Sequence, residues 1–235
     1  MPPPLSYRLR RVLAVGLAAF LCASTSLADE ETLMMRGMML APSAEDLPEF
    51  FVRGSKGLEP LVFGLNGPGK PVRAQAANPL PLFGNKLDEA GEPVIARSVN
   101  VPPGATSILL VGMIVRGNAE FFAVPDDFVG ARSDDWFFIN ATETTVALQV
   151  GAGTEPILLT PGAALPHRIS AEKGTGATVA IIKQEQPGGD WKAFYSAFWP
   201  VYQDQRCIVL LYGDSKKIRV KNIFDSVEAE STLPD

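Results

Sequence analysis

The sequence predicts an all-β protein, an antiparallel β-sandwich of jelly-roll or immunoglobulin-like topology, with a signal-peptide helix at its N-terminus. Short apolar segments are separated by turn-forming residues about every 8–12 positions, as in sandwiches and barrels. The 21 glycines and 20 prolines are spread through the chain and supply many of these turn-forming residues. No long segment after the N-terminus has the 3.6-residue period of an amphipathic helix, which argues against βαβ units.

Residues 1–28 have the three parts of a secretory signal peptide. Three arginines open the segment, an uncharged apolar run fills 12–22, and a small-x-small motif stands at 26–28. This order is typical of export signals. The apolar run is shorter than the ~20 residues that a membrane-spanning helix needs. We therefore expect cleavage after Ala28, no membrane span afterwards, and a periplasmic or extracellular location.

The chain that would remain after cleavage is acidic and large enough for a core without disulfides. Removing 1–28 leaves 207 residues with 18 basic and 26 acidic side chains, a net charge of −8. Such a surface favours solubility and repels phosphate backbones, so we expect no nucleic-acid partner. Cys207 would be the single remaining cysteine, and one cysteine cannot form an internal disulfide.

The turn-forming residues and the composition divide residues 29–235 into three parts. Residues 29–48 are Met-rich and then polar, and we interpret them as a flexible N-terminal arm. Its methionines could instead bind copper(I), although Met more often fills gaps in a core. Residues 49–225 are predicted to form one sandwich domain, since neither an interdomain linker nor a clear internal repeat is visible. Residues 226–235 form an acidic tail.

The predicted strands follow one another between turn signals such as Asn66-Gly67-Pro68-Gly69 and Pro102-Pro103-Gly104. Segments 135–140 and 144–150 are expected to pair as a hairpin, as are 206–212 and 216–224. In 216–224 a mostly apolar face alternates with a basic one, which predicts a half-buried strand. The first face holds Ile218, Val220, Asn222 and Phe224, and the second holds Lys217, Arg219, Lys221 and Ile223. The predicted strands are 50–56, 59–65, 72–77, 80–83, 93–101, 107–115, 120–124, 135–140, 144–150, 155–159, 165–171, 178–184, 206–212 and 216–224.

Residues 190–200 carry the most distinctive cluster of aromatic side chains. As a strand, the segment places Trp191, Tyr195 and Trp199 on one face; as a helix, it aligns another aromatic stripe. The flanking turn and the aromatic content favour a strand. Exposed rings on one face could stack on sugars, whereas buried rings would belong to the core. Trp191, Tyr195 and Trp199 are therefore the candidate binding residues.

The residue inventory offers little for catalysis or metal binding. The single histidine, His167, stands beside a Pro-Gly turn and is expected at a loop or strand edge. Cys207 lies in an apolar strand, where a thiol is unreactive. Zinc and blue-copper sites need more Cys and His ligands than these two. An acidic loop over residues 126–135 could hold calcium or be a solvated turn. We predict no cofactor and no metal site.

Several short motifs occur in a recognisable order. The sequence resembles uncharacterised exported β-sandwich proteins of planctomycete- and verrucomicrobia-type bacteria over roughly residues 50–225. This resemblance implies the sandwich fold and an envelope location, and it brings no activity or site residues. The motifs are VFGLN, PLPLF, VPPG, FFIN-x-T, V-x-L-x-V-G, L-x-PG, G-x-W-x-x-F-Y-S-x-x-W and R-x-I-V-L-L-Y.

These observations predict an exported, non-enzymatic protein with a structural or protein-interaction role in a Gram-negative-type cell envelope. A glycan-binding module that uses the aromatic strand is the alternative, so the expected partner is an envelope protein or a polysaccharide. A sugar hydrolase is a third hypothesis. It would require a concave pocket that holds two facing acids.

Overall fold

The computed structural model describes residues 31–40, 49–65, 67–115, 118–128, 130–132, 134–169, 175–184, 189–202, 204–214 and 217–226. They form β-strands and connecting turns, so the predicted all-β sandwich class is confirmed. The described residues belong to one compact unit, Glu31–Asp235. The predicted signal peptide lies outside the described residues, as does the acidic tail apart from Ser226.

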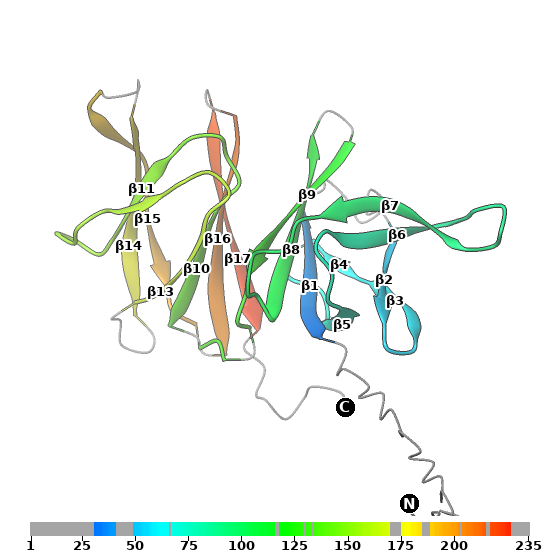
Figure 1. Ribbon diagram of the computed structural model, residues 1–235. Coiled ribbons are helices and arrows are strands. Elements are labelled where there is room, and N and C mark those ends of the chain that lie inside the picture. The colour runs from blue at the N-terminus through cyan, green and yellow to red at the C-terminus, as the bar shows by residue number, and fades with distance from the viewer. Residues whose placement is uncertain are drawn as a thin grey trace, which may run out of the picture. The chain divides into compact units, whose positions relative to one another are not determined.

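The strands pair into four sheets, which we name A to D (Figure 1). Sheet A has the order β4-β1-β8-β9, with β5 also paired to β1, and sheet B has the order β3-β2-β6-β7. Sheet C has the order β13-β10-β16-β17, and sheet D has the order β12-β11-β14-β15. Sheets A and B form one sandwich, the N-lobe, and sheets C and D form a second, the C-lobe.

The N-lobe strands are β1 (Thr32–Leu40), β2 (Phe50–Gly54), β3 (Gly57–Leu61), β4 (Phe63–Gly64), β5 (Val72–Gln75), β6 (Leu80–Leu87), β7 (Pro93–Val99), β8 (Ser107–Val115) and β9 (Asn118–Pro125). The C-lobe strands are β10 (Asp135–Asn140), β11 (Val146–Val150), β12 (Ile157–Leu159), β13 (Ala164–Arg168), β14 (Gly176–Gln184), β15 (Trp191–Pro200), β16 (Gln205–Gly213) and β17 (Ile218–Ser226).

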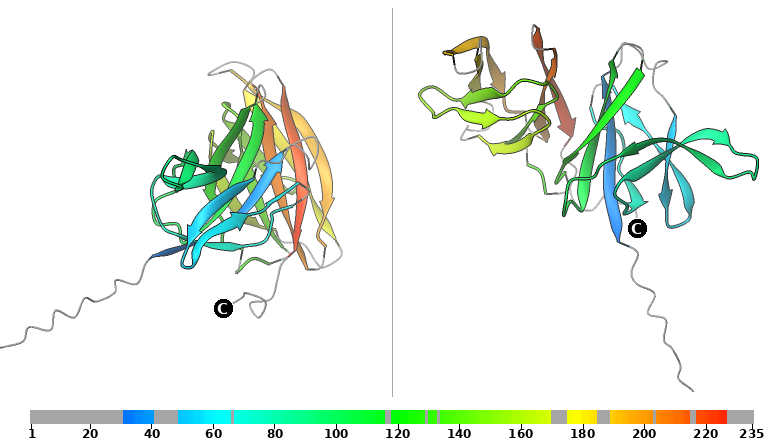
Figure 2. Two further views of the ribbon diagram at one scale, coloured as in Figure 1. Left: turned by 90° about the vertical axis from the view of Figure 1, so that its right-hand side faces the viewer. Right: turned by 45° about the horizontal axis from the view of Figure 1, so that its top comes forward.

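Three apolar cores hold the four sheets in the order B, A, C, D (Figures 1 and 2). On β8, Ile108 and Leu110 face sheet B, whereas Leu109 and Val111 face sheet C. On β16, Cys207 and Val209 face sheet D, whereas Ile208 and Leu210 face sheet A. Both faces of each central strand are therefore buried, which accounts for the continuous apolar runs in these segments.

The two lobes repeat one topology. In each, the first strand runs parallel to the central strand (β1 with β8, β10 with β16), and that strand continues antiparallel into the last one. The outer sheets even share a β-bulge. Their register shifts between Leu82 and Phe83 in the N-lobe and between Ile181 and Ile182 in the C-lobe. A bulge at the same place in two otherwise equivalent sheets indicates that the two lobes are structural repeats.

The repeat leaves almost no trace in the sequence. When the β8–β9 hairpin, residues 107–126, is superposed by register on the β16–β17 hairpin, residues 206–225, only Asp126 and Asp225 are identical. The predicted single sandwich at 49–225 is thus corrected to two sandwiches within one compact unit. Apolar character is kept at matching core positions, such as Leu109 with Ile208 and Val124 with Ile223, while residue identity is not.

Most predicted strands are confirmed within a few residues, including the segment 190–200 as β15 and the final hairpin β16–β17. The predicted hairpin of 135–140 with 144–150 is wrong. β10 pairs with β13 and β16 in sheet C, whereas β11 pairs with β12 and β14 in sheet D. The turn between them carries the chain from one sheet of the sandwich to the other.

The prediction of a flexible arm at 29–48 is wrong for Thr32–Leu40, which form strand β1. Residues 41–48 lie outside the described residues. β1 is a central strand of sheet A, bonded on both sides. Met35 and Met39 point into the N-lobe core and Met38 points into the core between the lobes. Because these thioethers lie on opposite faces of a strand, they do not converge as ligands of one copper ion.

A ring of four buried charges ties the lobes together at one end of their interface. Each lobe supplies one arginine and one aspartate. The Arg36 guanidinium donates to both oxygens of Asp225 at 2.8 Å and to Asp126 at 2.9 Å. Arg206 donates to Asp126 at 2.6 Å and to Asp225 at 2.9 Å. The side chains are at most 7% exposed, and the ring is electrically neutral.

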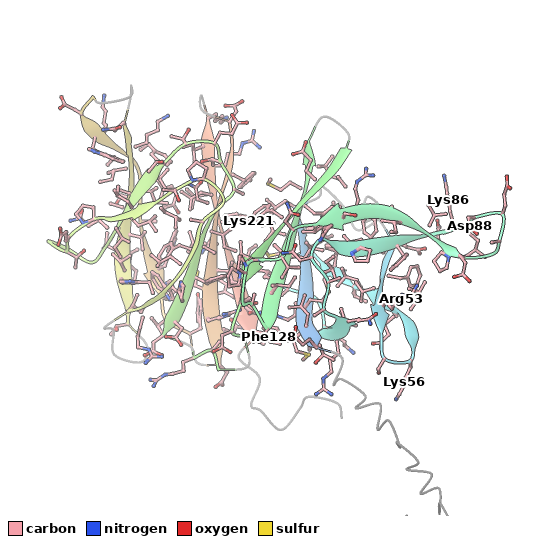
Figure 3. All side chains as sticks on the ribbon, viewed as in Figure 1. Arg53, Lys56, Lys86, Asp88, Phe128 and Lys221 are labelled. Atoms are coloured by element: carbon pink, nitrogen blue, oxygen red, sulfur yellow. The ribbon has the colours of Figure 1, made fainter. Side chains whose placement is uncertain are left out.

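The surroundings of the ring fit its charges. Burial by itself would lower the pKa of Arg36, but hydrogen bonds and Coulombic attraction from Asp225 and Asp126 raise it instead. The Phe128 ring lies 4.2 Å from the Arg36 guanidinium carbon, and the Phe137 ring lies 5.5 Å from that of Arg206. These cation–π contacts replace part of the lost hydration. Figure 3 places Phe128 between the lobes.

We predict that Asp225→Asn destabilises the protein by about 3–5 kcal/mol, because it leaves two buried guanidinium groups with one carboxylate. Urea unfolding followed by tryptophan fluorescence measures the loss. The matched control is Asp135→Asn, which weakens the exposed pair of Asp135 with Arg168, and should cause a clearly smaller loss. Equal losses in the two variants would contradict this account.

Candidate functional site

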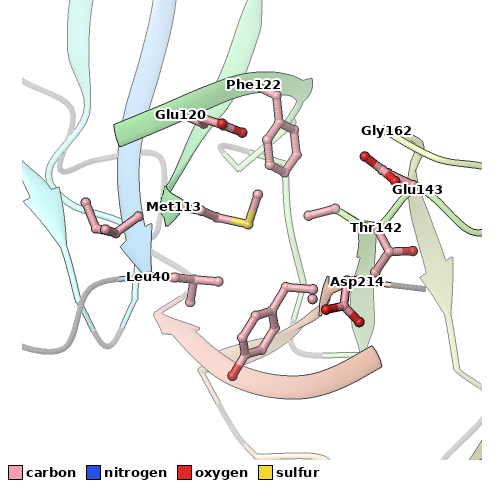
Figure 4. Close-up of a pocket in the computed structure, with 12 residues that line it drawn as sticks. Leu40, Met113, Glu120, Phe122, Thr142, Glu143, Gly162 and Asp214 are labelled. Carbon is pink, nitrogen blue, oxygen red and sulfur yellow. The ribbon is translucent and has the colours of Figure 1, made fainter. Parts of the chain in front are cut away.

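A groove with a volume of about 830 Å³ lies at the lobe interface (Figure 4). Both lobes line it, at the end of the interface opposite to the charge ring. We call it the interlobe groove. Its lining residues are Leu40, Met113, Ile114, Glu120, Phe122, Ala141, Thr142, Glu143, Gly162, Tyr212, Gly213 and Asp214.

Equivalent positions in the two lobes form the floor of the interlobe groove. The β8–β9 and β16–β17 registers make Met113 the counterpart of Tyr212, and the first strands make Leu40 the counterpart of Ala141. Leu40, Phe122 and Tyr212 are half-buried and pack against the interlobe core. The groove is therefore the open end of the same apolar interface that joins the lobes.

Carboxylates stand at the rim of the interlobe groove. Glu120 comes from β9 of the N-lobe, and Glu143 comes from the turn after β10 of the C-lobe. Both are exposed, and neither has an ion-pair partner among the described residues. Asp214 also lines the groove, and its Oδ1 accepts a hydrogen bond from the Lys217 backbone N–H at 2.8 Å. The described residues of the lining include no lysine, arginine or histidine.

A hydrogen-bonded turn fixes the position of Glu143. The Asn140 amide donates to the carbonyl oxygens of Thr144 and Leu159, at 2.9 and 3.0 Å. Its Oδ1 accepts from the backbone N–H and the hydroxyl of Thr142. Asn140 is fully buried, so the glycosylation-like motif Asn140-Ala-Thr142 serves as a structural turn, and its amide nitrogen is not available at the surface.

The structure separates the three predicted binding residues. Trp199 is 5% exposed and packs in the C-lobe core, where its ring centroid lies 5.7 Å from that of Trp136. Tyr195 is half-buried against the same core, whereas Trp191 is 41% exposed. A common stacking platform of Trp191, Tyr195 and Trp199 is therefore ruled out by their burial.

The β-bulge in sheet D causes this separation. Tyr195 is opposite Ile181, but the next pair is Ala193 with Ile182, so Phe194 is the extra residue. Because one inserted residue reverses the alternation of side chains, Trp191 points away from the core that holds Tyr195 and Trp199. Phe198, at 62% exposure, lies on the outer face with Trp191.

The two other reactive side chains considered from the sequence lie apart from the groove. His167 is on β13, an edge strand of sheet C, as expected, and its ring lies 6.4 Å from that of Phe138. Cys207 is buried in the C-lobe core. Burial raises the pKa of its thiol to about 12, outweighing a backbone hydrogen bond that favours the thiolate.

The acidic loop considered for calcium has its carboxylates engaged within the protein. Asp126 belongs to the buried charge ring. Asp134 pairs with Arg132, and Asp135 pairs with Arg168. Although partial burial opposes it, hydrogen bonds from Arg168 and Arg132 lower the pKa of Asp135. No cluster that could hold a metal ion occurs among the residues that the structure describes.

Sequence reasoning did not identify the interlobe groove. Glu120, Phe122, Glu143 and Tyr212 stand in ordinary strands and turns, with no spacing that relates them. They meet because β9, β10 and β16 come together at one end of two packed sheets. The only available signal was the duplication itself, which the divergence of the two copies conceals.

Comparison with protein-family models found no match for this chain, and comparison with curated proteins found none either. The resemblance to exported sandwich proteins of planctomycete- and verrucomicrobia-type bacteria therefore stays a prediction. Within the described segments, no helix has the length and hydropathy needed to cross a membrane.

We predict that Cys207 reacts with a thiol reagent such as dithionitrobenzoate only after unfolding. With a pKa of about 12 the thiol stays protonated at pH 8, and the core excludes the reagent. The measurement uses a chain without residues 1–28, in which Cys207 is the single cysteine. Full reaction in urea and none in buffer is expected. Rapid reaction of the folded protein would show that the C-lobe core opens.

Proposed function

We propose that this protein is an exported, non-enzymatic interaction protein of the cell envelope that binds a partner in the interlobe groove. The groove itself carries the proposal, because it exposes the end of an apolar interface that is otherwise sealed. Exposed apolar surface rimmed by polar groups is typical of interaction sites. The charge ring and the interlobe core hold the two walls at a fixed separation, which favours binding by preorganisation.

The same groove bears on the hydrolase hypothesis, because it holds acids on facing walls. Glu120 and Glu143 are both exposed to solvent. A glycosidase general acid needs an apolar, desolvated setting that keeps it protonated near neutral pH. Neither side chain has such a setting, so the geometry favours binding over acid catalysis.

We predict that a photo-crosslinking residue at Ile114 captures a distinct partner in cells that express the protein. Ile114 stands at the rim of the groove and is 37% exposed. The control position is Leu158 on β12, which is 62% exposed and lies outside the groove lining. Adducts separated by electrophoresis and identified by mass spectrometry should form at position 114 and not at 158. A Met113→Trp variant, which places a larger side chain in the groove lining, should abolish them.

Two outcomes would overturn this proposal. One is the same set of adducts, or none, at both positions. The other is hydrolysis of an envelope polysaccharide by the purified protein that Glu143→Gln abolishes, since this would make the groove an active site.

Glycan binding remains the second candidate, now on Trp191 together with Phe198 in place of Tyr195 and Trp199. Trp191 and Phe198 are exposed on the outer face of β15, and the register places Gln184 beside Trp191 and Thr178 beside Phe198. Aromatic rings with polar neighbours can stack on sugars and accept their hydroxyl groups. The lining of the interlobe groove, however, includes neither Trp191 nor Phe198.

We predict for this candidate that envelope polysaccharide quenches or shifts the fluorescence of Trp191, the exposed tryptophan, while Trp136 and Trp199 are shielded in the core. Trp191→Phe should remove the response without changing stability. Tyr195→Phe, a change within the core-facing side, serves as the control and should keep the response. An unchanged wild-type spectrum at saturating polysaccharide would exclude glycan binding at β15.

A further inference from the structure

We infer that the occupant of the interlobe groove is an extended polypeptide segment that carries lysine or arginine beside apolar side chains. This inference rests on the proposed function and specifies the chemistry of the partner. Three features support it: the apolar floor, the charge of the rim, and the free edge of strand β9.

The apolar floor requires apolar groups in the partner. Leu40, Met113, Phe122 and Tyr212 line the groove in the space between the sheets (Figure 4). Half-buried side chains of this kind gain free energy when a partner covers them, by about 25 cal/mol per Å² of apolar area removed from water. Methionine in particular adapts to partners of different shape.

The rim selects a positive charge. Glu120 and Glu143 approach the same opening from different lobes, as Figure 4 shows. Two like charges repel each other, and a cation between them removes this repulsion while gaining attraction to both. Tyr212 and Phe122 in the floor add aromatic faces to which a guanidinium or ammonium group is attracted. Among the described residues that line the groove, none is basic, so none of these side chains opposes a cation.

The edge of sheet A favours an extended polypeptide over a small cation. β9 is the last strand of sheet A, and among the described strands it pairs with β8 alone. Its other edge therefore presents backbone N–H and C=O groups that an added strand can bond. Glu120 and Phe122 belong to this strand and line the groove. A segment with alternating residues could thus place basic side chains at the rim and apolar ones over the floor.

The test compares two short fluorescein-labelled peptides, one in which lysine and valine alternate and one in which glutamate replaces lysine. Fluorescence anisotropy measures their dissociation constants with the chain lacking residues 1–28. The lysine peptide should bind, and the glutamate peptide should bind at least about ten-fold more weakly at low salt. High salt should reduce this preference, because it screens the rim charges.

The decisive variant is Glu120→Gln with Glu143→Gln. Both side chains are exposed, so the fold should be unaffected, and affinity for the lysine peptide should fall about five-fold or more. The matched control is Glu89→Gln with Glu155→Gln, which removes the same charge from exposed positions outside the groove. Glu89 follows Asp88 at the outer end of the β6–β7 hairpin (Figure 3), and this control should bind as the wild type does.

The outcomes separate the two proposals. Equal affinity for both peptides, no binding of the lysine peptide, or equal losses in the two double variants would overturn the cationic-segment inference. If specific crosslinks at position 114 persist in that case, the groove still binds a partner, but of another chemistry. If those crosslinks are missing as well, the proposed function fails with the inference.

Discussion

The fold depends on the burial of the central sheets A and C on both faces. Each must be covered by its own outer sheet and by the other central sheet, so its strands have no side that can be polar throughout. Leu109 and Ile208 occupy equivalent positions and meet in the interlobe core. A surface that would be solvated in a single sandwich is apolar here. The interface has the character of a homodimer contact made within one chain.

The charge ring and the groove are the two ends of this interface. At one end, Arg36 and Arg206 each bridge Asp126 and Asp225. A buried ion cluster contributes little net stability compared with apolar packing, but it tolerates few alternative arrangements because any misplacement leaves a charge unpaired. It therefore fixes the register of one lobe on the other. The interlobe groove lies at the other end. Its apolar floor belongs to the same interface, and Glu120 and Glu143 form its acidic rim.

Sequence patterns predicted local structure better than pairing. Apolar alternation and turn residues located nearly all the strands, and the basic face of 216–224 was correctly distinguished from Ile218, Val220 and Phe224. Ile223, on that basic face, is nonetheless 3% exposed because it packs against the other lobe. The Met-rich β1 was missed since its signal is not an alternating one. The stacking platform was wrong because a single bulge at Phe194 reversed the direction of Trp191.

The amino-acid sequence by itself determined the strand class and the turn positions, since these follow from local propensity and composition. Only the tertiary structure decided that there are two sandwiches, that Arg36 meets an aspartate 189 positions away, and that Glu120 and Glu143 share one opening. Contacts of that kind depend on which sheet faces pack together. Many different strand pairings are compatible with the same apolar periodicity, so the pattern alone does not select one of them.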